Sequence, residues 1–182
     1  PTMFFAAPVK NRQGRVIAVV TQRINPSRDF TRLIQLGQIG KSGETYAFDR
    51  FGKLLSESRF NEDLRKIGLI SEDQMSILTV SVRDPGGDMA SGFTPTVPRY
   101  QQPLTLMARE ATRGNSGLNV TGYRDYRGVT VYGAWLWDNQ LQIGLATEID
   151  VSDALGPYYT TRTVILTVLA ITVLLALGSL VF

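Results

Sequence analysis

The densest set of aromatic and charged side chains in the sequence lies in one segment and shortly after it: Tyr123, Arg124, Asp125, Tyr126, Arg127, Trp135 and Trp137. An arginine binds a carboxylate through two parallel hydrogen bonds, and aromatic rings can close over a ligand held in this way. The segment therefore predicts a pocket for a small carboxylate or an amino acid. Strand alternation places Tyr123, Asp125 and Arg127 on one face, with Arg124 and Tyr126 on the other.

A purely structural explanation of the same residues stays open beside the pocket. Aromatic and charged side chains on neighbouring strands commonly pack against one another, with an ion pair left at the surface. This arrangement needs no ligand, and we favour it unless a further signal marks a binding site.

Catalytic chemistry has little support in the sequence. The chain contains no cysteine and no histidine, which excludes Cys-His and Ser-His-Asp nucleophiles, thiolate or imidazole zinc sites, and haem ligation by either residue. The segment Gly40–Gly43 is too short for a phosphate-binding loop. The remaining acidic residues show no catalytic spacing, and we expect each to be a turn cap or a solvated strand residue: Glu44, Asp49, Glu57, Asp125 and Glu148. We therefore expect no enzyme, no metal and no cofactor.

Composition excludes some partners as well. The net charge is only +3, and basic residues are interspersed with acidic ones, so nucleic acid is not an expected partner. The absence of cysteine also means that no disulfide marks an exported domain.

A membrane segment is the clearest element. Residues 163–182 contain no charged side chain, and twenty helical residues span roughly 30 Å, the thickness of a bilayer core. We predict a transmembrane helix here, with lipid as its partner. Tyr158 and Tyr159 suit the headgroup level, and Arg162 can extend its charge to the same level. Gly156-Pro157 should interrupt any helix that runs from Asp150 into the membrane.

The rest of the chain alternates short strands, helices and loops. Asn25 followed by Pro26 predicts the start of a helix that ends at Gly37 or Gly40. The other expected elements are strands at Met3–Val9 and Arg15–Ile24, a hairpin of Thr45–Phe48 and Lys53–Ser58, helical pieces over Asn61–Ser76, a loop at Arg83–Pro103, a helix at Leu104–Thr112 and three strands over 117–150.

One pattern occurs twice. The segments "IAVVTQRINPSRDF" (17–30) and "IGLATEIDVSDAL" (143–155) both run from an apolar strand through an Asn or Asp cap into a helix. We interpret this as a duplication. Residues 1–24 would be the last strands of a first, incomplete module, 25–40 a connecting helix, and 41–155 a complete second module. Because no signal peptide is visible after Pro1, we also expect the true start of the protein to lie upstream.

Two segments resemble the Cache family of sensor domains. "GKSGETYAFDRFGKLLSESRF" (40–60) is similar to the opening of a Cache module, and "YRDYRGVTVYGAWLWDNQLQIGLATEID" (123–150) is similar to its closing strands. The resemblance implies an α+β, PAS-like antiparallel sheet flanked by helices and followed by one transmembrane helix. The tandem arrangement resembles the double Cache sensors of bacterial receptors, histidine kinases and cyclases. The family's N-terminal membrane helix and its effector domain are not in this sequence.

The resemblance also implies a site and a role. Tyr46 and Arg59 would face the same cavity as the aromatic cluster, which makes the candidate ligand-binding residues Tyr46, Arg59, Tyr123, Asp125, Arg127 and Trp135. The implied function is small-molecule sensing on the extracytoplasmic (periplasmic) side of the cell membrane by a single-pass, homodimeric receptor. The alternative is an accessory subunit that docks into a larger membrane complex, such as a respiratory or photosynthetic one, beside other membrane subunits.

Overall fold

In the computed structural model, residues 2–181 are described. The strands are β1 (Met3–Lys10), β2 (Val16–Ile24), β3 (Glu44–Phe48), β4 (Gly117–Arg124), β5 (Thr130–Asp138) and β6 (Ile143–Asp150). The α-helices are α1 (Thr31–Ile34), α2 (Asn61–Lys66), α3 (Leu106–Thr112), α4 (Val151–Ala154) and α5 (Gly156–Val181). Short helical turns lie at Pro26–Phe30, Gln35–Gly37, Met89–Ser91 and Arg99–Gln101. The α+β prediction is therefore confirmed.

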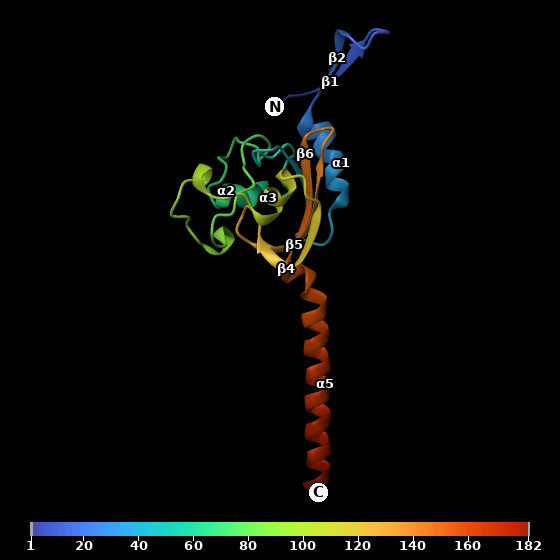
Figure 1. The fold of residues 1–182 in the computed structure, drawn as a ribbon. Helices are drawn as coiled ribbons and strands as arrows, with labels where there is room; N and C mark the ends of the chain where they lie inside the picture. Colours follow the sequence, from blue (N-terminus) through green and yellow to red (C-terminus); the bar gives the residue numbers. More distant parts are fainter. Residues whose placement is uncertain (1, 182) are drawn as a thin grey trace.

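Strands β1 and β2 form a separate antiparallel hairpin that projects beyond the body of the protein (Figure 1). Its turn closes with a hydrogen bond from the Gly14 N–H to the Asn11 carbonyl, and Gly14 has a φ of 79°, which glycine adopts without a steric penalty. After β2, the side chain of Asn25 accepts from the Ser27 N–H at 3.1 Å, so the predicted cap and the start of the helix at Pro26 are both present.

The main sheet has four antiparallel strands in the order β3-β6-β5-β4. Its first and last strands in the sequence, β3 and β6, are therefore neighbours. In Figure 1 the segment around α1 covers one face of the sheet, while α2, α3 and the long loops cover the other. The core lies on this second face and includes Leu64, Val82 and Met107, all fully buried.

The prediction of a strand over Lys53–Ser58 is wrong, because no continuous strand forms there. Only the isolated bridges Phe48–Leu54 and Lys53–Ser81 form there. Serine hydroxyl groups take the place of ladder partners: the Ser56 Oγ accepts from the Ala47 N–H at 3.0 Å, and the Ser58 N–H donates to the Ser76 Oγ at 2.7 Å. Such side-chain bonds compete directly with strand pairing.

Helix α5 extends away from the body of the protein (Figure 1). An 18-residue window within Gly156–Gly178 has a mean hydropathy of 2.0, and no part of this window is buried against the rest of the described chain. Four threonine hydroxyls donate to carbonyls within the helix, from Thr160, Thr163, Thr167 and Thr172; the Thr163 Oγ, for example, donates to the Tyr159 carbonyl at 2.9 Å. The helix is long and apolar enough to cross a membrane, and it starts before the predicted 163–182 segment, whose last residue, Phe182, lies outside the described residues.

The predicted interruption before α5 is present. Helix α4 ends at Ala154, Leu155 separates it from α5, and Pro157 occupies the first turn of the new helix. A proline fits there because the N–H groups of the first turn have no helical partner. The separation is small, since Leu155 still donates to the Val151 carbonyl and accepts from the Tyr159 N–H.

Candidate functional site

Two buried glutamates lie opposite each other on the neighbouring strands β3 and β6. Glu44 of β3 and Glu148 of β6 are register partners, and their exposed fractions are only 3% and 4%. Glu148 accepts a hydrogen bond on each carboxylate oxygen, from the Tyr46 hydroxyl at 2.8 Å and from the Tyr123 hydroxyl at 2.5 Å. Both tyrosines are also buried, so the contacts are shielded from water.

Glu44 has a similar set of donors from other elements. The Tyr126 hydroxyl donates to Glu44 Oε2 at 2.6 Å, and the Arg59 backbone N–H donates to Oε1 at 2.8 Å. The Ser58 hydroxyl lies 2.7 Å from the Tyr126 hydroxyl and extends the chain of contacts. Three tyrosines from three segments therefore meet two carboxylates in the core.

Burial controls the protonation of these groups. It raises the pKa of Glu44 and, together with the negative charge of Asp125, raises the pKa of Glu148 to about 8, although the tyrosine hydrogen bonds oppose the shift. Burial and the nearby glutamates raise the pKa of Tyr46 and of Tyr126, so both hydroxyls stay protonated donors.

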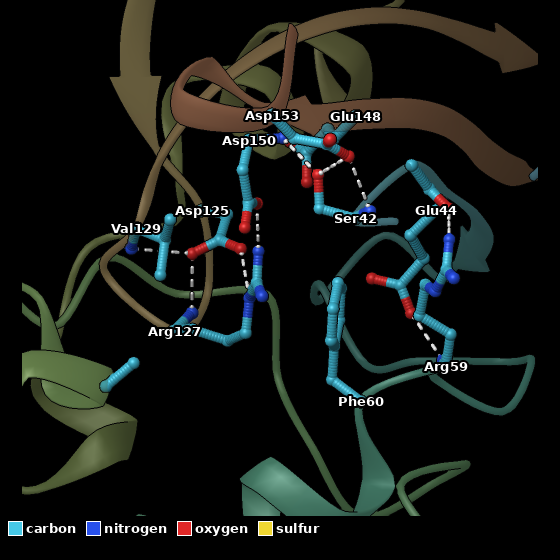
Figure 2. Close-up of polar contacts among 12 residues, drawn as sticks. Ser42, Glu44, Arg59, Phe60, Asp125, Arg127, Val129, Glu148, Asp150 and Asp153 are labelled. Atoms are coloured by element: carbon cyan, nitrogen blue, oxygen red, sulfur yellow. Dashed lines mark hydrogen bonds and ion pairs between the residues drawn. The ribbon is translucent and has the colours of Figure 1, made fainter. Parts of the chain in front are cut away.

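Arg127 is held in the turn between β4 and β5 (Figure 2). Its Nε donates to Asp125 at 2.6 Å, its Nη2 donates to Asp150 at 2.5 Å, and its guanidinium carbon lies 3.7 Å from the centroid of the Phe60 ring. Burial alone lowers the pKa of Arg127, but Asp125, Tyr126 and Asp150 together raise it above its usual value. The guanidinium is thus fixed on two edges and one face.

A cleft of about 550 Å³ opens beside this arginine. It is lined by residues of several segments: Lys41, Ser42, Phe60, Asp63, Asp88, Ala90, Arg127, Val129, Asp150, Ser152 and Asp153. Four aspartates against one lysine and one arginine make its surface acidic. Such a cleft suits a ligand that carries a positive charge in addition to any carboxylate.

One wall of the cleft is tied together at the end of β6 (Figure 2). Asp153 Oδ2 accepts from the Lys41 N–H, the Ser42 N–H and the Ser42 hydroxyl, each at 2.8 Å. The Ser42 Oγ in turn accepts from the Asp150 N–H at 3.1 Å. These donors lower the pKa of Asp153, the Ser42 N–H most of all. The segment before β3 is thereby fastened to the segment that leads into α5.

A second pocket, of about 340 Å³, lies near the other end of β5 and includes Arg50, Arg113 and Trp137 in its lining. The Arg50 Nη2 donates to the Gln142 side-chain oxygen at 2.5 Å. No residue of α4 or α5 lines this pocket, whereas Ser152 and Asp153 of α4 line the cleft beside Arg127. In the described part of the chain, no group of three or more acidic side chains is arranged to hold a metal ion.

The six predicted ligand-binding residues do not form one pocket. Arg127 lines the cleft, whereas Tyr46 and Tyr123 bind Glu148 inside the core. The Trp135 ring packs edge-on to the Tyr123 ring at 6.2 Å between centroids. The remaining two also bind other parts of the chain: the Arg59 guanidinium donates to the Gly43 carbonyl, and Asp125 pairs with Arg127.

Two expectations about this region are wrong. We expect Tyr126 on the face opposite Tyr123, but both rings pack in the same core, because β4 ends at Arg124 and the alternation stops where the turn begins. Glu44, Glu57 and Glu148 were expected to be caps or solvated, yet all three are buried. The signal that could have located Glu44 is its spacing of two and four residues from Tyr46 and Phe48, which share its inward face.

The surface ion pair and the turn cap that we expect from a purely structural role are also found. Arg124 forms a partly exposed, bidentate ion pair with Asp84, at 2.8 and 3.0 Å. Asp49 caps the tight turn after β3, where it accepts from the Phe51 and Lys53 N–H groups. Tyr158, Tyr159 and Arg162 are exposed in the first turns of α5, and their role at the membrane interface stays a prediction.

Comparison with known proteins gives a similarity of fold to a solved structure. No family model matches the sequence, and no curated protein matches it. Among solved structures, the chain is similar to one described as "Crystal Structure of the extracellular domain of the putative histidine kinase mmHK1S-Z3", with a TM-score of 0.53 and 11% sequence identity over 87% of this chain. The chain covers 48% of the length of that domain. At this identity the likeness concerns the fold alone: the chain shares the fold of about half of that extracellular domain, and it carries a helix that is long and apolar enough to cross a membrane.

Proposed function

We propose that the chain is the membrane-proximal part of a Cache-type sensor, with its folded domain outside the cytoplasm and α5 as its single membrane anchor. The fold likeness to an extracellular domain of a histidine kinase supports this, as does the exposed apolar helix that follows β6. No catalytic role is part of the proposal. Signalling to an effector would occur through α5.

The observation that carries the proposal is that the residues leading into the membrane helix line the cleft. Asp150, Ser152 and Asp153 line the cleft, and α5 begins at Gly156. If Asp150, Ser152 and Asp153 adopt two conformations and a ligand binds one of them more tightly, the ligand shifts the population of α4 toward that conformation. Such a difference in affinity is the requirement for any ligand-driven switch.

The contacts of Arg127 suggest how a ligand would act. Because Asp125 and Asp150 each bind one side of the guanidinium, a ligand carboxylate can bind it bidentately only by displacing Asp150. Of the two carboxylates, Asp150 is the easier one to displace from Arg127, because its side chain is 18% exposed and that of Asp125 is only 2% exposed. Displacement would release the last residue of β6 just before α4.

The acidic lining narrows the ligand class. A dicarboxylate would meet repulsion from Asp63, Asp88 and Asp153. An amino acid would place its carboxylate at Arg127 and its ammonium group among these aspartates. We therefore propose a small zwitterion in preference to a plain carboxylate.

The test is a thermal-shift and calorimetric screen of amino acids, betaines and small carboxylates on the full chain in detergent or nanodiscs. At least one zwitterion should raise the melting temperature. Binding should be lost in Arg127→Lys, because lysine cannot replace a bidentate guanidinium. The matched control is Arg124→Lys, which alters an arginine outside the cleft. A broad library without any stabilising compound would contradict sensing at this cleft.

Sidedness needs its own measurement. The chain has no cysteine, so a single Gln140→Cys substitution in an exposed turn gives one labelling site. A membrane-impermeant maleimide applied to intact cells should label it if the domain lies outside. Labelling only after cell lysis would contradict the proposed orientation.

One feature favours the alternative, an accessory subunit of a membrane assembly. The β1–β2 hairpin exposes large apolar residues, including Phe4, Ile17 and Val20 at 61%, 63% and 62%. An isolated two-stranded hairpin is marginally stable, so its apolar faces need cover, either from the upstream residues that we expect or from a partner subunit. Stoichiometric co-purification with other membrane subunits, lost on Ile17→Ser, would support this function over sensing.

A further inference from the structure

The buried core holds more acid than base. Glu44, Glu148 and Asp125 are all almost fully buried, and Arg127 is the guanidinium packed among them. Arg127 makes its ion pairs with Asp125 and Asp150, so neither glutamate has an ion-pair partner among the described residues. Two unpaired buried carboxylates on facing strands cannot both stay ionised without a large desolvation cost.

The groups around the pair come from every element packed against it. Tyr46 of β3 and Tyr123 of β4 donate to Glu148, and Tyr126 donates to Glu44. The charged groups nearby are Asp125, Arg127 and Asp150 of the β4–β5 turn and the end of β6, together with Arg59, whose guanidinium binds the Gly43 carbonyl. Helix α3 contributes only apolar side chains to the core: Met107, Ala108 and Ala111.

We propose that Glu44 and Glu148 form a proton-binding site, which holds one proton between the two carboxyl groups and couples its release to the packing of β6 against β3. This site is separate from the cleft and goes beyond the proposed function, because its ligand is the proton. With one proton present, the core contains a single net negative charge on the pair. When Glu148 holds the proton, the charge stays on Glu44, which accepts from the Tyr126 hydroxyl and the Arg59 backbone N–H.

Release of the proton to solvent leaves a second carboxylate directly opposite the first. Like charges at opposed positions of an antiparallel pair are destabilising, and no additional cation lies beside them. The repulsion acts on the β3–β6 pairing, and β6 runs through Asp150 into α4. A rise in external pH would therefore loosen the strand that leads to the membrane helix.

Hydrogen exchange of the full chain in nanodiscs tests the proposal. Amides of β3 and β6, corrected for intrinsic exchange rates, should lose protection by at least about tenfold between about pH 6 and about pH 9, because a shift of one pKa unit corresponds to a factor of ten in an equilibrium. In Glu148→Gln this dependence should disappear. The matched control, Glu62→Gln at an exposed position of α2, should keep the wild-type dependence.

A second readout covers the case in which Glu148→Gln does not fold. In the wild-type chain, the infrared carbonyl stretch of a protonated carboxyl group should persist at about pH 7, where an ordinary glutamate is ionised. Glu44→Gln should change the midpoint of its loss. Absence of that band, or protection that falls equally in wild type and Glu148→Gln, would overturn the proposal.

Discussion

Glu148 of β6 lies directly opposite Glu44 of β3 in the sheet register, and both carboxyl groups are buried. Three tyrosine hydroxyls and a backbone N–H stabilise the two buried carboxyl groups at this position by hydrogen bonding to them. The pair joins the first and last strands of the four-stranded sheet, and β6 continues to the membrane helix. The stability of this junction therefore depends on the tyrosines.

Tyr123→Phe should lower the free energy of unfolding by about 1–3 kcal/mol, because Glu148 Oε1 would lose its donor inside the core. Chemical denaturation of the detergent-solubilised chain measures the change. Tyr100→Phe is the control, since Tyr100 is 74% exposed, and its effect should be within about 0.5 kcal/mol. Equal effects of the two substitutions would contradict the buried role of Tyr123.

Stability should fall as the pH rises from about 5 to about 8. Glu148 has an ordinary pKa of 4.5 in the unfolded chain and about 8 in the folded protein, so the folded state binds more protons in this window. The contribution is fully present below pH 4.5 and is lost through pH 8. Chemical denaturation at a series of pH values measures how the free energy of unfolding changes with pH. The prediction would be contradicted if this free energy rose with pH across the window in the wild type and did not rise in Glu148→Gln.

Arg127→Met should destabilise the domain by about 3–5 kcal/mol, because it leaves Asp125 buried without its cation. The double variant Asp125→Asn with Arg127→Met should recover part of the loss. A double-mutant cycle measures the coupling between the two residues. Additive effects would show that the pair does not interact as the structure describes.

Gly144→Ala should destabilise the sheet by about 1–3 kcal/mol. A Cβ at this position would lie 2.2 Å from the Phe48 ring, which packs across Gly144. Adding Phe48→Leu should restore part of the stability by making room. Gly156→Ala, where a Cβ meets nothing within 4 Å, is the control and should leave the unfolding midpoint almost unchanged.

Leu169→Arg should weaken membrane insertion by about 3 kcal/mol, because it places a charge near the middle of α5. Carbonate extraction of membranes measures the loss of the integrated form. Thr160→Arg lies near the predicted interface, beside Arg162, and should remain integrated. If both variants stay in the membrane fraction to the same extent, α5 does not span the bilayer.

Local signals in the sequence were sufficient for some elements. The Asn25-Pro26 helix start, the separation before Pro157 and the apolar helix follow from capping, proline geometry and hydropathy, which depend on neighbouring residues only. The strand at Lys53–Ser58 was wrong because serine side chains replaced its ladder partners. The division into two modules stays a prediction.

The candidate site could be predicted only in fragments. Arg127 was recognised by its residue type, but its engagement by Asp150 and Phe60 depends on segments far away in the sequence. Glu148 was missed because acidic residues are usually solvated, and its tyrosine partners are known only once the strands are in register. The cleft combines five separate segments, which no local pattern indicates.

The central claim is that a ligand in the cleft competes with Asp150 for Arg127. The most direct measurement is calorimetric titration of the zwitterions that stabilise the wild-type chain into Asp150→Asn and, for comparison, Asp150→Glu. Removal of the competing charge should tighten binding by about tenfold in Asp150→Asn, a gain of about 1.4 kcal/mol, while Asp150→Glu should stay near wild type. Weaker binding in Asp150→Asn, or no binding by any compound of the screen, would contradict the account.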